Sequence, residues 1–215
     1  MIRGLLFDLD GVLVDTAGYH FEAWQYIAAE LGIPFGEAQN EQLKGVSRAE
    51  SLNRILAWGG LQCSDAEKQQ WMTLKNERYL ELMSAMPADG YLPGAHDFLL
   101  ASRAAGLKIA LGSASKNAPL ILERLGWIPL FDALVDGNVV SASKPNPEVF
   151  LEGARRLNLQ PSECLVFEDS EAGVEAARRA GMKVVGIGQG LDADLLVSGL
   201  DRLTPQQAVQ LETSN

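Results

Sequence analysis

Three short apolar runs along the chain end abruptly in small or acidic polar residues. They are LLFDLDG at 5–11, LKIALGSASKN at 107–117 and CLVFEDSEAG at 164–173. Each run is followed by residues with helical spacing, and a fourth run, MKVVGIG at 182–188, follows a helical segment and Gly181. Continuous apolar runs of this length are typical of strands buried on both faces. Their alternation with helices predicts an α/β fold built on a doubly wound, Rossmann-like parallel sheet.

The stretch from residue 16 to residue 88 breaks this alternation. His20, Trp24, Ile27 and Leu31 fall at helical spacing, and helical patterns cover 48–58 and 65–84 with no strand-like run between them. Connections between strands and helices are usually a few residues long, so an insertion of this length predicts a separate domain. We expect an α/β core of residues 1–15 and 89–215, and an α-helical cap of residues 16–88 joined to it by two linkers.

Polar side chains stand where the predicted strands end. Because ligands of open α/β sheets bind outside the carboxyl ends of the strands, we expect these side chains to converge: Asp8, Asp10, Ser113, Glu168 and Asp169. One aspartate at a strand end could simply cap the following helix. Four carboxylates buried together are costly without cations, however, and Mg²⁺ prefers oxygen ligands. The pattern therefore favours one magnesium ion per chain and chemistry on a phosphate.

Composition limits the possible partners. The 215 residues allow one large core with a small second domain, and the net charge of −10 argues against binding to nucleic acid or anionic membranes. Cys63 and Cys164 lack the spacing of a metal site, and no run approaches the ~18 apolar residues of a membrane span. We expect reduced cysteines, a cytoplasmic location and a monomer.

Four motifs together resemble those of the haloacid dehalogenase-like phosphotransferases. They are DLDGVLVDT at 8–16, the serine of ALGSAS at 110–115, the lysine of ASKPNPEVF at 142–150 and the acidic pair of VFEDS at 166–170. Within that superfamily, DTAGYHFEAW, QLKGVSR, KNERY and SASKN are similar to β-phosphoglucomutases. The resemblance implies interconversion of β-D-glucose 1-phosphate and D-glucose 6-phosphate through β-D-glucose 1,6-bisphosphate, which would also serve as activator.

The resemblance implies a role for each core residue. Asp8 would be the nucleophile that becomes an aspartyl phosphate, and Asp10 would be the general acid and base. These roles predict that neighbouring negative charge holds a proton on Asp10, while the metal ion and a lysine keep Asp8 ionised. Lys144 and Ser113 would stabilise the transferring phosphoryl group. The implied metal ligands are Asp8, the backbone carbonyl of Asp10, Glu168 and Asp169.

A mutase also needs a site for its second phosphate. The resemblance places Arg48 of the cap and the core loop Ser115, Lys116 and Asn117 there, with Gly45 and Val46 on the sugar. A guanidinium suits phosphate through its paired donors, although an isolated Arg48 is more typical of a solvated surface.

His20 has two interpretations. Its place on the stripe with Trp24 and Ile27 is typical of a partly buried structural histidine. The resemblance instead groups His20 with Thr16 and Lys75 in a hinge network that brings Asp10 into position when the cap closes.

Two other functions remain as alternatives. A sugar-phosphate phosphatase of the same superfamily would use the same core motifs, with water attacking the phosphorylated Asp8. A phospho-aspartate receiver module would share the sheet, but receivers are not expected to contain so large a helical insertion or a second aspartate acting as an acid.

Overall fold

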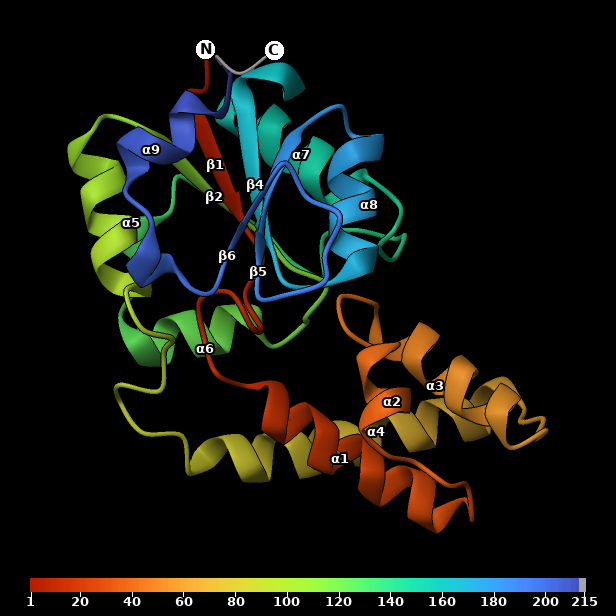
Figure 1. The fold of residues 1–215 in the computed structure, drawn as a ribbon. Helices are drawn as coiled ribbons and strands as arrows, with labels where there is room; N and C mark the ends of the chain where they lie inside the picture. The colour runs from red at the N-terminus through yellow and green to blue at the C-terminus, as the bar shows by residue number, and fades with distance from the viewer. Residues whose placement is uncertain (213–215) are drawn as a thin grey trace.

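The computed structural model describes residues 1–212, and a parallel sheet lies at its centre (Figure 1). Six strands run in the order β3-β2-β1-β4-β5-β6, and all neighbouring strands are parallel. Their bounds are β1 Gly4–Phe7, β2 Lys108–Gly112, β3 Ala133–Val135, β4 Cys164–Glu168, β5 Lys183–Ile187 and β6 Leu195–Val197. The predicted doubly wound fold is confirmed. The edge strands β3 and β6 were not predicted, because each has only three residues and gives little pattern.

Side chains alternate between the two faces of the sheet, and helices cover both. Leu5 and Phe7 of β1 face one apolar cluster, whereas Leu6 faces the other. Helices α5 (Ala95–Ala104), α6 (Ala118–Leu125) and α9 (Pro205–Val209) contribute to the first cluster. Helices α7 (Glu148–Leu157) and α8 (Glu171–Arg179) cover the opposite face (Figure 1). Short 3₁₀ turns lie at Ile128–Leu130, Pro161–Glu163, Leu200–Arg202 and Gln210–Glu212.

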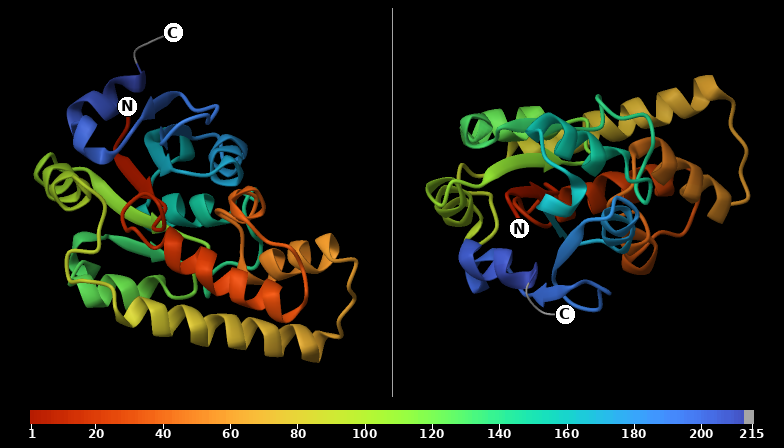
Figure 2. Two further views of the ribbon diagram at one scale, coloured as in Figure 1. Left: turned by 60° about the horizontal axis from the view of Figure 1, so that its bottom comes forward. Right: turned by 90° about the horizontal axis from the view of Figure 1, so that it is seen from above.

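Four helices form a second body beside the sheet, with α1 lying along α4 (Figures 1 and 2). They are α1 Ala17–Glu30, α2 Glu37–Glu41, α3 Arg48–Trp58 and α4 Asp65–Ser84. The helices predicted at 48–58 and 65–84 are confirmed. Ser47 and Ser64 cap α3 and α4 through their side chains, which explains why both helices begin where they do. These helices enclose an apolar cluster of their own around Trp24, Ile27 and Ile55.

The two crossings between this cap and the sheet lie side by side. Val14 of the first crossing pairs with Tyr91 of the second, and the Leu92 N–H donates to the Leu13 carbonyl at 3.0 Å. Tyr79 and Met83, near the end of α4, pack in the sheet-side cluster rather than in the cap cluster. Within residues 1–212, no helix combines the length and apolar character needed to cross a membrane.

Candidate active site

Asp8 lies directly after β1, in the middle of the sheet. Its side chain is buried beside Lys144, whose Nζ donates to Asp8 Oδ1 at 2.7 Å and also to Glu168 Oε1. Glu168 ends the neighbouring strand β4, and Lys144 lies in the loop between β3 and α7. Lys144 also stands 4.8 Å from the centre of the Phe150 ring. The lysine is therefore fixed by two carboxylates and an aromatic face, and it has little freedom to move.

Negative charge at this edge exceeds the positive charge available to balance it. Oxygen atoms of Asp8, Glu168 and Asp169 lie within 4.8 Å of one another. Burial, only partly offset by Lys144, together with the neighbouring carboxylates raises the pKa of Asp8 well above its usual range. Burial and Glu168 raise the pKa of Asp169 to about 7. A hard divalent cation fits such a set of oxygen ligands and would balance the excess charge. These three ligands are side chains, so the Asp10 backbone carbonyl stays a predicted fourth ligand.

A glycine allows Asp169 to approach the β1 loop. Gly11 has a φ of +80°, a conformation that favours glycine, and a Cβ atom there would collide with the Asp169 carboxylate. The DLDG spacing therefore serves the packing of the acidic cluster as well as the turn that follows β1.

Asp10 faces a different set of partners, which come from the start of the cap. Thr16 donates its hydroxyl to Asp10 Oδ1, and His20 Nε2 lies 3.4 Å from the same oxygen. Lys75 Nζ lies 2.9 Å from His20 Nδ1. When Lys75 is charged, its ammonium group can only donate, so Nδ1 accepts this bond and a neutral His20 has its proton on Nε2, toward Asp10. The structure thus brings the predicted network of Thr16, His20 and Lys75 together around Asp10.

The cap network changes the pKa of each member. Burial alone would raise the pKa of Asp10, but His20, Thr16 and Lys75 outweigh it and lower that pKa. Burial, followed by repulsion from Lys75, lowers the pKa of His20. Burial and the nearby Arg48 lower the pKa of Lys75 to about 7. Burial and neighbouring cations therefore favour the uncharged forms of His20 and Lys75.

The two aspartates differ in how the protein's own groups shift their pKa values. Among these groups alone, the pKa of Asp8 is raised and that of Asp10 is lowered, whereas the predicted ionised Asp8 depends on a metal ion as well as a lysine. The reason is local. Burial is the largest cause for Asp8, which shares its one lysine with Glu168, whereas Asp10 has a hydroxyl donor, an imidazole and Lys75 nearby.

The loop after β2 forms a second part of the site. Ser113 is buried, and its Oγ accepts a hydrogen bond from the Ser115 N–H at 3.1 Å. Ser115 Oγ in turn accepts from the Asn117 N–H at 3.2 Å. This bond leaves the Ser113 hydroxyl hydrogen free to donate, and Ser113 lines the same cavity as Asp8. Each serine holds the backbone two residues ahead of it, which fixes the shape of the 115–117 loop.

Asn76 joins the cap to this loop, and sequence reasoning missed it. Its Oδ1 accepts from Arg48 Nη2 at 2.7 Å and from Asn117 Nδ2 at 2.9 Å. Arg48 is the first residue of α3, and Asn117 precedes α6. Asn76 follows Lys75 in the KNERY motif, so the motif pointed to this part of the chain. Its two partners, Arg48 and Asn117, come near it only in the folded chain.

The cap loop at residues 43–47 rests on two serines of the core that were also missed. The Ser47 N–H donates to Ser143 Oγ at 2.7 Å. Gly45 has a φ of +72°, and a Cβ atom there would collide with Ser170 Oγ. Glycine at 45 therefore lets the cap backbone approach the core closely.

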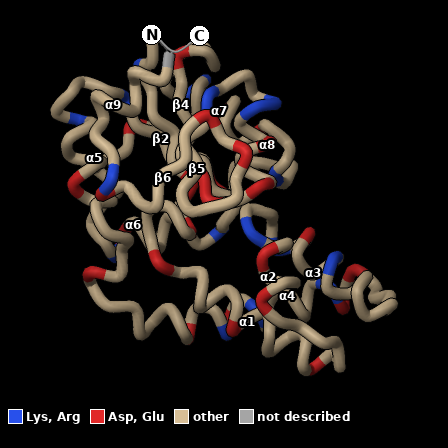
Figure 3. Tube along the Cα trace, viewed as in Figure 1, with Lys and Arg blue, Asp and Glu red and all other residues tan. Residues whose placement is uncertain are grey.

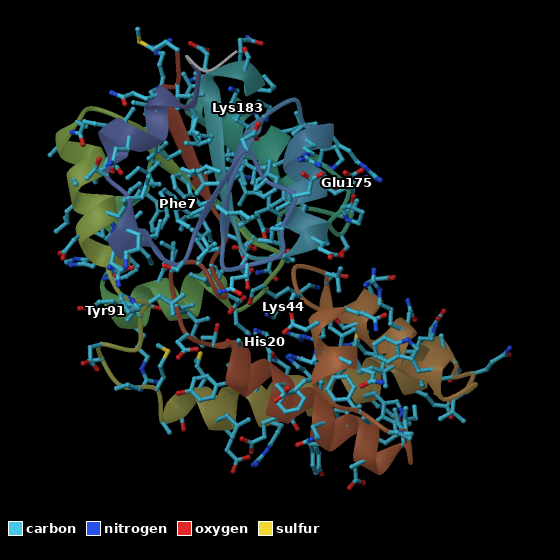
Figure 4. All side chains as sticks on the ribbon, in the orientation of Figure 1. Phe7, His20, Lys44, Tyr91, Glu175 and Lys183 are labelled. Carbon is cyan, nitrogen blue, oxygen red and sulfur yellow. The ribbon has the colours of Figure 1, made fainter. Side chains whose placement is uncertain are left out.

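Cap and core enclose a cavity of about 320 Å³. It is lined by most of the predicted residues: Asp8, Asp10, His20, Gly45, Val46, Arg48, Lys75, Ser113, Ser115, Lys116, Asn117 and Asp169. Three predicted residues lie behind this lining. Thr16 bonds Asp10, and Lys144 bonds both Asp8 and Glu168. Lys44, which also lines the cavity, lies with His20 between the two parts (Figure 4). Basic and acidic positions both occur where cap and core face each other (Figure 3).

Residues 2–181 match the family model of the haloacid dehalogenase-like hydrolases. The chain belongs to the haloacid dehalogenase-like family. It is 45% identical over 208 residues to a β-phosphoglucomutase from Bacillus subtilis, which covers 94% of this chain and 92% of that protein. It is 32% identical over 184 residues to a phosphorylated carbohydrates phosphatase from Thermotoga maritima, covering 85% and 83% of the two chains.

A solved structure agrees with this assignment. The crystal structure of a β-phosphoglucomutase from Clostridium difficile superposes with a TM-score of 0.94 at 38% identity, covering 99% of this chain and 98% of that one. The match includes the helical cap as well as the sheet, since nearly the whole chain is covered. The match to relatives of this family therefore includes the cap helices, whose residues line part of the cavity.

Proposed function

We propose that the protein is a magnesium-dependent β-phosphoglucomutase that interconverts β-D-glucose 1-phosphate and D-glucose 6-phosphate through β-D-glucose 1,6-bisphosphate. The observation that carries this proposal is the composition of the cavity between cap and core. It is lined by Asp8, the proposed phosphoryl acceptor, and by hydrogen-bond donors suited to a second phosphate, Arg48 and the 115–117 loop. The similarity to the two β-phosphoglucomutases supports the same conclusion.

Asp8 is the nucleophile in this mechanism. Its carboxylate forms a bond to phosphorus as the bond from phosphorus to the sugar oxygen breaks, which leaves an aspartyl phosphate. Lys144, 2.7 Å from Asp8 Oδ1, and the Ser113 hydroxyl are placed to stabilise negative charge on the transferring group. A Mg²⁺ ion held by Asp8, Glu168, Asp169 and the Asp10 carbonyl would supply further charge neutralisation and keep Asp8 ionised.

Asp10 moves the proton. It gives a proton to the departing sugar oxygen and later accepts one from the sugar hydroxyl that attacks the aspartyl phosphate. Thr16 and His20 hold its carboxylate, and Lys75 holds His20. Because Thr16 lies at the first crossing while His20 and Lys75 lie on cap helices, the position of Asp10 depends on where the cap sits.

The second phosphate is bound between cap and core. Arg48 and Asn117 both donate to Asn76 Oδ1, so their donors already point toward one place. Together with Ser115 and Lys116 they can bind the phosphate that is not reacting, while Gly45 and Val46 contact the sugar. Reversal of the bisphosphate in this cavity then presents either phosphate to Asp8.

The competing function is hydrolysis, which is the activity named for the Thermotoga maritima relative. In a phosphatase, water replaces the sugar hydroxyl as the group that attacks the phosphorylated Asp8. The core residues serve both reactions, so the distinction depends on the cap: Arg48, His20 and Lys75 favour transfer to a bound sugar by closing the site around it.

One assay separates the two functions. The purified protein with Mg²⁺ and a trace of glucose 1,6-bisphosphate is given β-D-glucose 1-phosphate, and glucose 6-phosphate and inorganic phosphate are measured together. We expect glucose 6-phosphate as the main product and a rate that rises with added bisphosphate, its activator. Formation of mainly glucose and inorganic phosphate would replace the mutase proposal with the phosphatase.

The remaining parts of the proposal concern the state of the protein. We place it in the cytoplasm as a monomer, with no nucleic acid or membrane partner. The free cysteines Cys63 and Cys164 and the net charge of −10 support this. Sedimentation of the purified protein at micromolar concentration tests the monomer.

A further inference from the structure

Helix α6 touches α4 at two separate places. At its beginning, Asn117 donates to Asn76 Oδ1 at 2.9 Å, beside the cavity. At its end, Arg124 reaches the last turn of α4. Because α6 starts directly after the 115–117 loop, this one helix connects the phosphate loop to the base of the cap.

Arg124 makes three hydrogen bonds at the end of α4. Its Nη1 donates to the carbonyl of Met83 at 3.1 Å, and its Nη2 donates to those of Ser84 at 2.9 Å and Met86 at 2.7 Å. The last carbonyls of a helix lack regular partners and carry the negative end of the helix dipole, so a guanidinium suits them. Met83 and Met86 are also buried in the sheet-side apolar cluster. This end of α4 is therefore held to the core by packing and by charge.

The other half of α4 belongs to the cap. Trp71, Met72 and Leu74 pack against the cap cluster. Lys75 and Asn76 stand between the two halves, where they reach His20 and Asn117. The place where α4 is fixed to the core therefore determines where these two side chains lie when the cap is closed.

Helix geometry gives the size of this effect. From Ser84 back to Asn76 the helix spans about 12 Å, at ~1.5 Å per residue. A tilt of about 5° at the fixed end would move Asn76 by roughly 1 Å, and a misplacement of that size can cost on the order of 10²-fold in rate. Small movements at Arg124 would therefore reach the reacting groups.

We propose that Arg124 is a positioning residue for the phosphoryl transfer: it fixes the end of α4 to the core, so that Lys75 and Asn76 reach His20 and Asn117 when the cap closes. This inference rests on the proposed mutase function. Arg124 does not line the cavity and touches no reacting atom. It acts through α4.

The test uses Arg124→Met, which keeps the aliphatic stem and removes all donors. With Mg²⁺, β-D-glucose 1-phosphate and glucose 1,6-bisphosphate, the ratio of inorganic phosphate released to glucose 6-phosphate formed is measured. Water that reaches the aspartyl phosphate breaks its bond to Asp8 and releases inorganic phosphate, so a poorly closed site raises this ratio. We expect the ratio to rise at least threefold. Partial unfolding lowers both products together and leaves the ratio unchanged.

Two further variants complete the design. Arg124→Lys keeps a charged donor for the same carbonyls, and we expect it to restore most of the wild-type ratio. Arg103→Met is the matched control. Arg103 on α5 also donates to a backbone carbonyl, that of Leu130 at 3.1 Å, but this bond does not involve α4. We expect Arg103→Met to keep the wild-type ratio.

Amide hydrogen exchange of residues 79–86 separates this inference from the mutase proposal. We expect faster exchange in Arg124→Met and unchanged exchange in Arg103→Met. If the wild type releases mainly inorganic phosphate, the mutase proposal fails, and the exchange still reports whether Arg124 fixes α4. Unchanged exchange in Arg124→Met would overturn the anchoring. Faster exchange with an unchanged product ratio would overturn the positioning role.

Discussion

The two aspartates after β1 are two residues apart, yet their surroundings belong to different parts of the molecule. Asp8 lies among strand ends, where Lys144 and Glu168 are buried and paired. Asp10 faces Thr16 at the first crossing and His20 on a cap helix. The groups around Asp8 are fixed by the sheet, whereas those around Asp10 come together only when the cap is in place. This difference suits a nucleophile that is always ready and an acid that is assembled with the substrate.

Asp8→Asn tests the core side and should have the largest effect. Removing a nucleophile that no other residue replaces should lower turnover by on the order of 10⁴-fold or more. Lys144 keeps Glu168 as a partner, so we expect the thermal unfolding midpoint to stay close to that of the wild type. Formation of an acid-stable or base-labile phosphoprotein by the variant, or turnover near the wild-type rate, would contradict the nucleophile assignment.

Asp10→Asn is the matching change on the other aspartate. We expect turnover to fall by ~10²-fold to 10⁴-fold, the usual contribution of general acid and base catalysis. The amide keeps an acceptor for Thr16, so the fold should be retained, as circular dichroism can verify. A variant with substantial activity would remove Asp10 from the proton transfer.

Arg48→Ala extends the comparison to the far end of the cavity. Loss of hydrogen bonds to a charged phosphate should raise the KM for the sugar phosphate roughly tenfold to a hundredfold. The control is Arg54→Ala on the same helix, whose guanidinium bonds Glu50 and the Gln42 carbonyl. An unaltered KM in Arg48→Ala would count against the distal phosphate site.

His20→Ala tests whether the cap network positions Asp10. The expected loss in rate is about tenfold, below the ~10² that removal of an acid or base itself costs. The affinity for Mg²⁺ should not change, because His20 is not one of the residues in the cluster that would bind the metal. The control is His96→Ala, since His96 packs against Tyr91 and Trp127 away from Asp10. An unchanged rate would support the structural interpretation of His20.

Lys75 gives the smallest effect and the clearest pH dependence. Its pKa in the folded chain is about 7, below its ordinary value of 10.5. Between these values the unfolded chain binds a proton that the folded chain does not, so this group makes stability rise with pH, by at most about 1.4 kcal/mol per pH unit. Lys75→Met should flatten the rise between pH 7 and pH 9, measured by urea unfolding. Lys68→Met on the same helix should not, and equal slopes in all three proteins would refute the prediction.

Much of the architecture could be predicted because short stretches of sequence indicate each strand and helix. Apolar runs such as 5–9 and 164–168 indicate buried strands wherever they occur, and the carboxyl ends of parallel strands must share an edge. The helices at 48–58 and 65–84 begin at capping serines that are visible in the sequence. The short edge strands were missed because three residues give no usable period.

The site was predictable in its core and less so in its cap. The strand-end acids and Lys144 occur in compact motifs, and the structure gathers them as expected. Asn76, Ser143 and Ser170 were missed because a polar residue on a helix or loop has no local mark of what it will bond. Asn76 and Asn117 are 41 residues apart in the chain.

The sequence by itself determined the parallel sheet, the helical insertion and the convergence of Asp8, Asp10, Glu168 and Asp169 on one edge. Only the tertiary structure decided that Asp8 has the raised pKa and Asp10 the lowered one, since that order depends on burial and on which charges lie nearby. It also decided that Arg124 holds the end of α4. Local patterns follow from the backbone geometry of neighbouring residues, whereas pKa values and helix positions follow from distances between segments that only folding brings together.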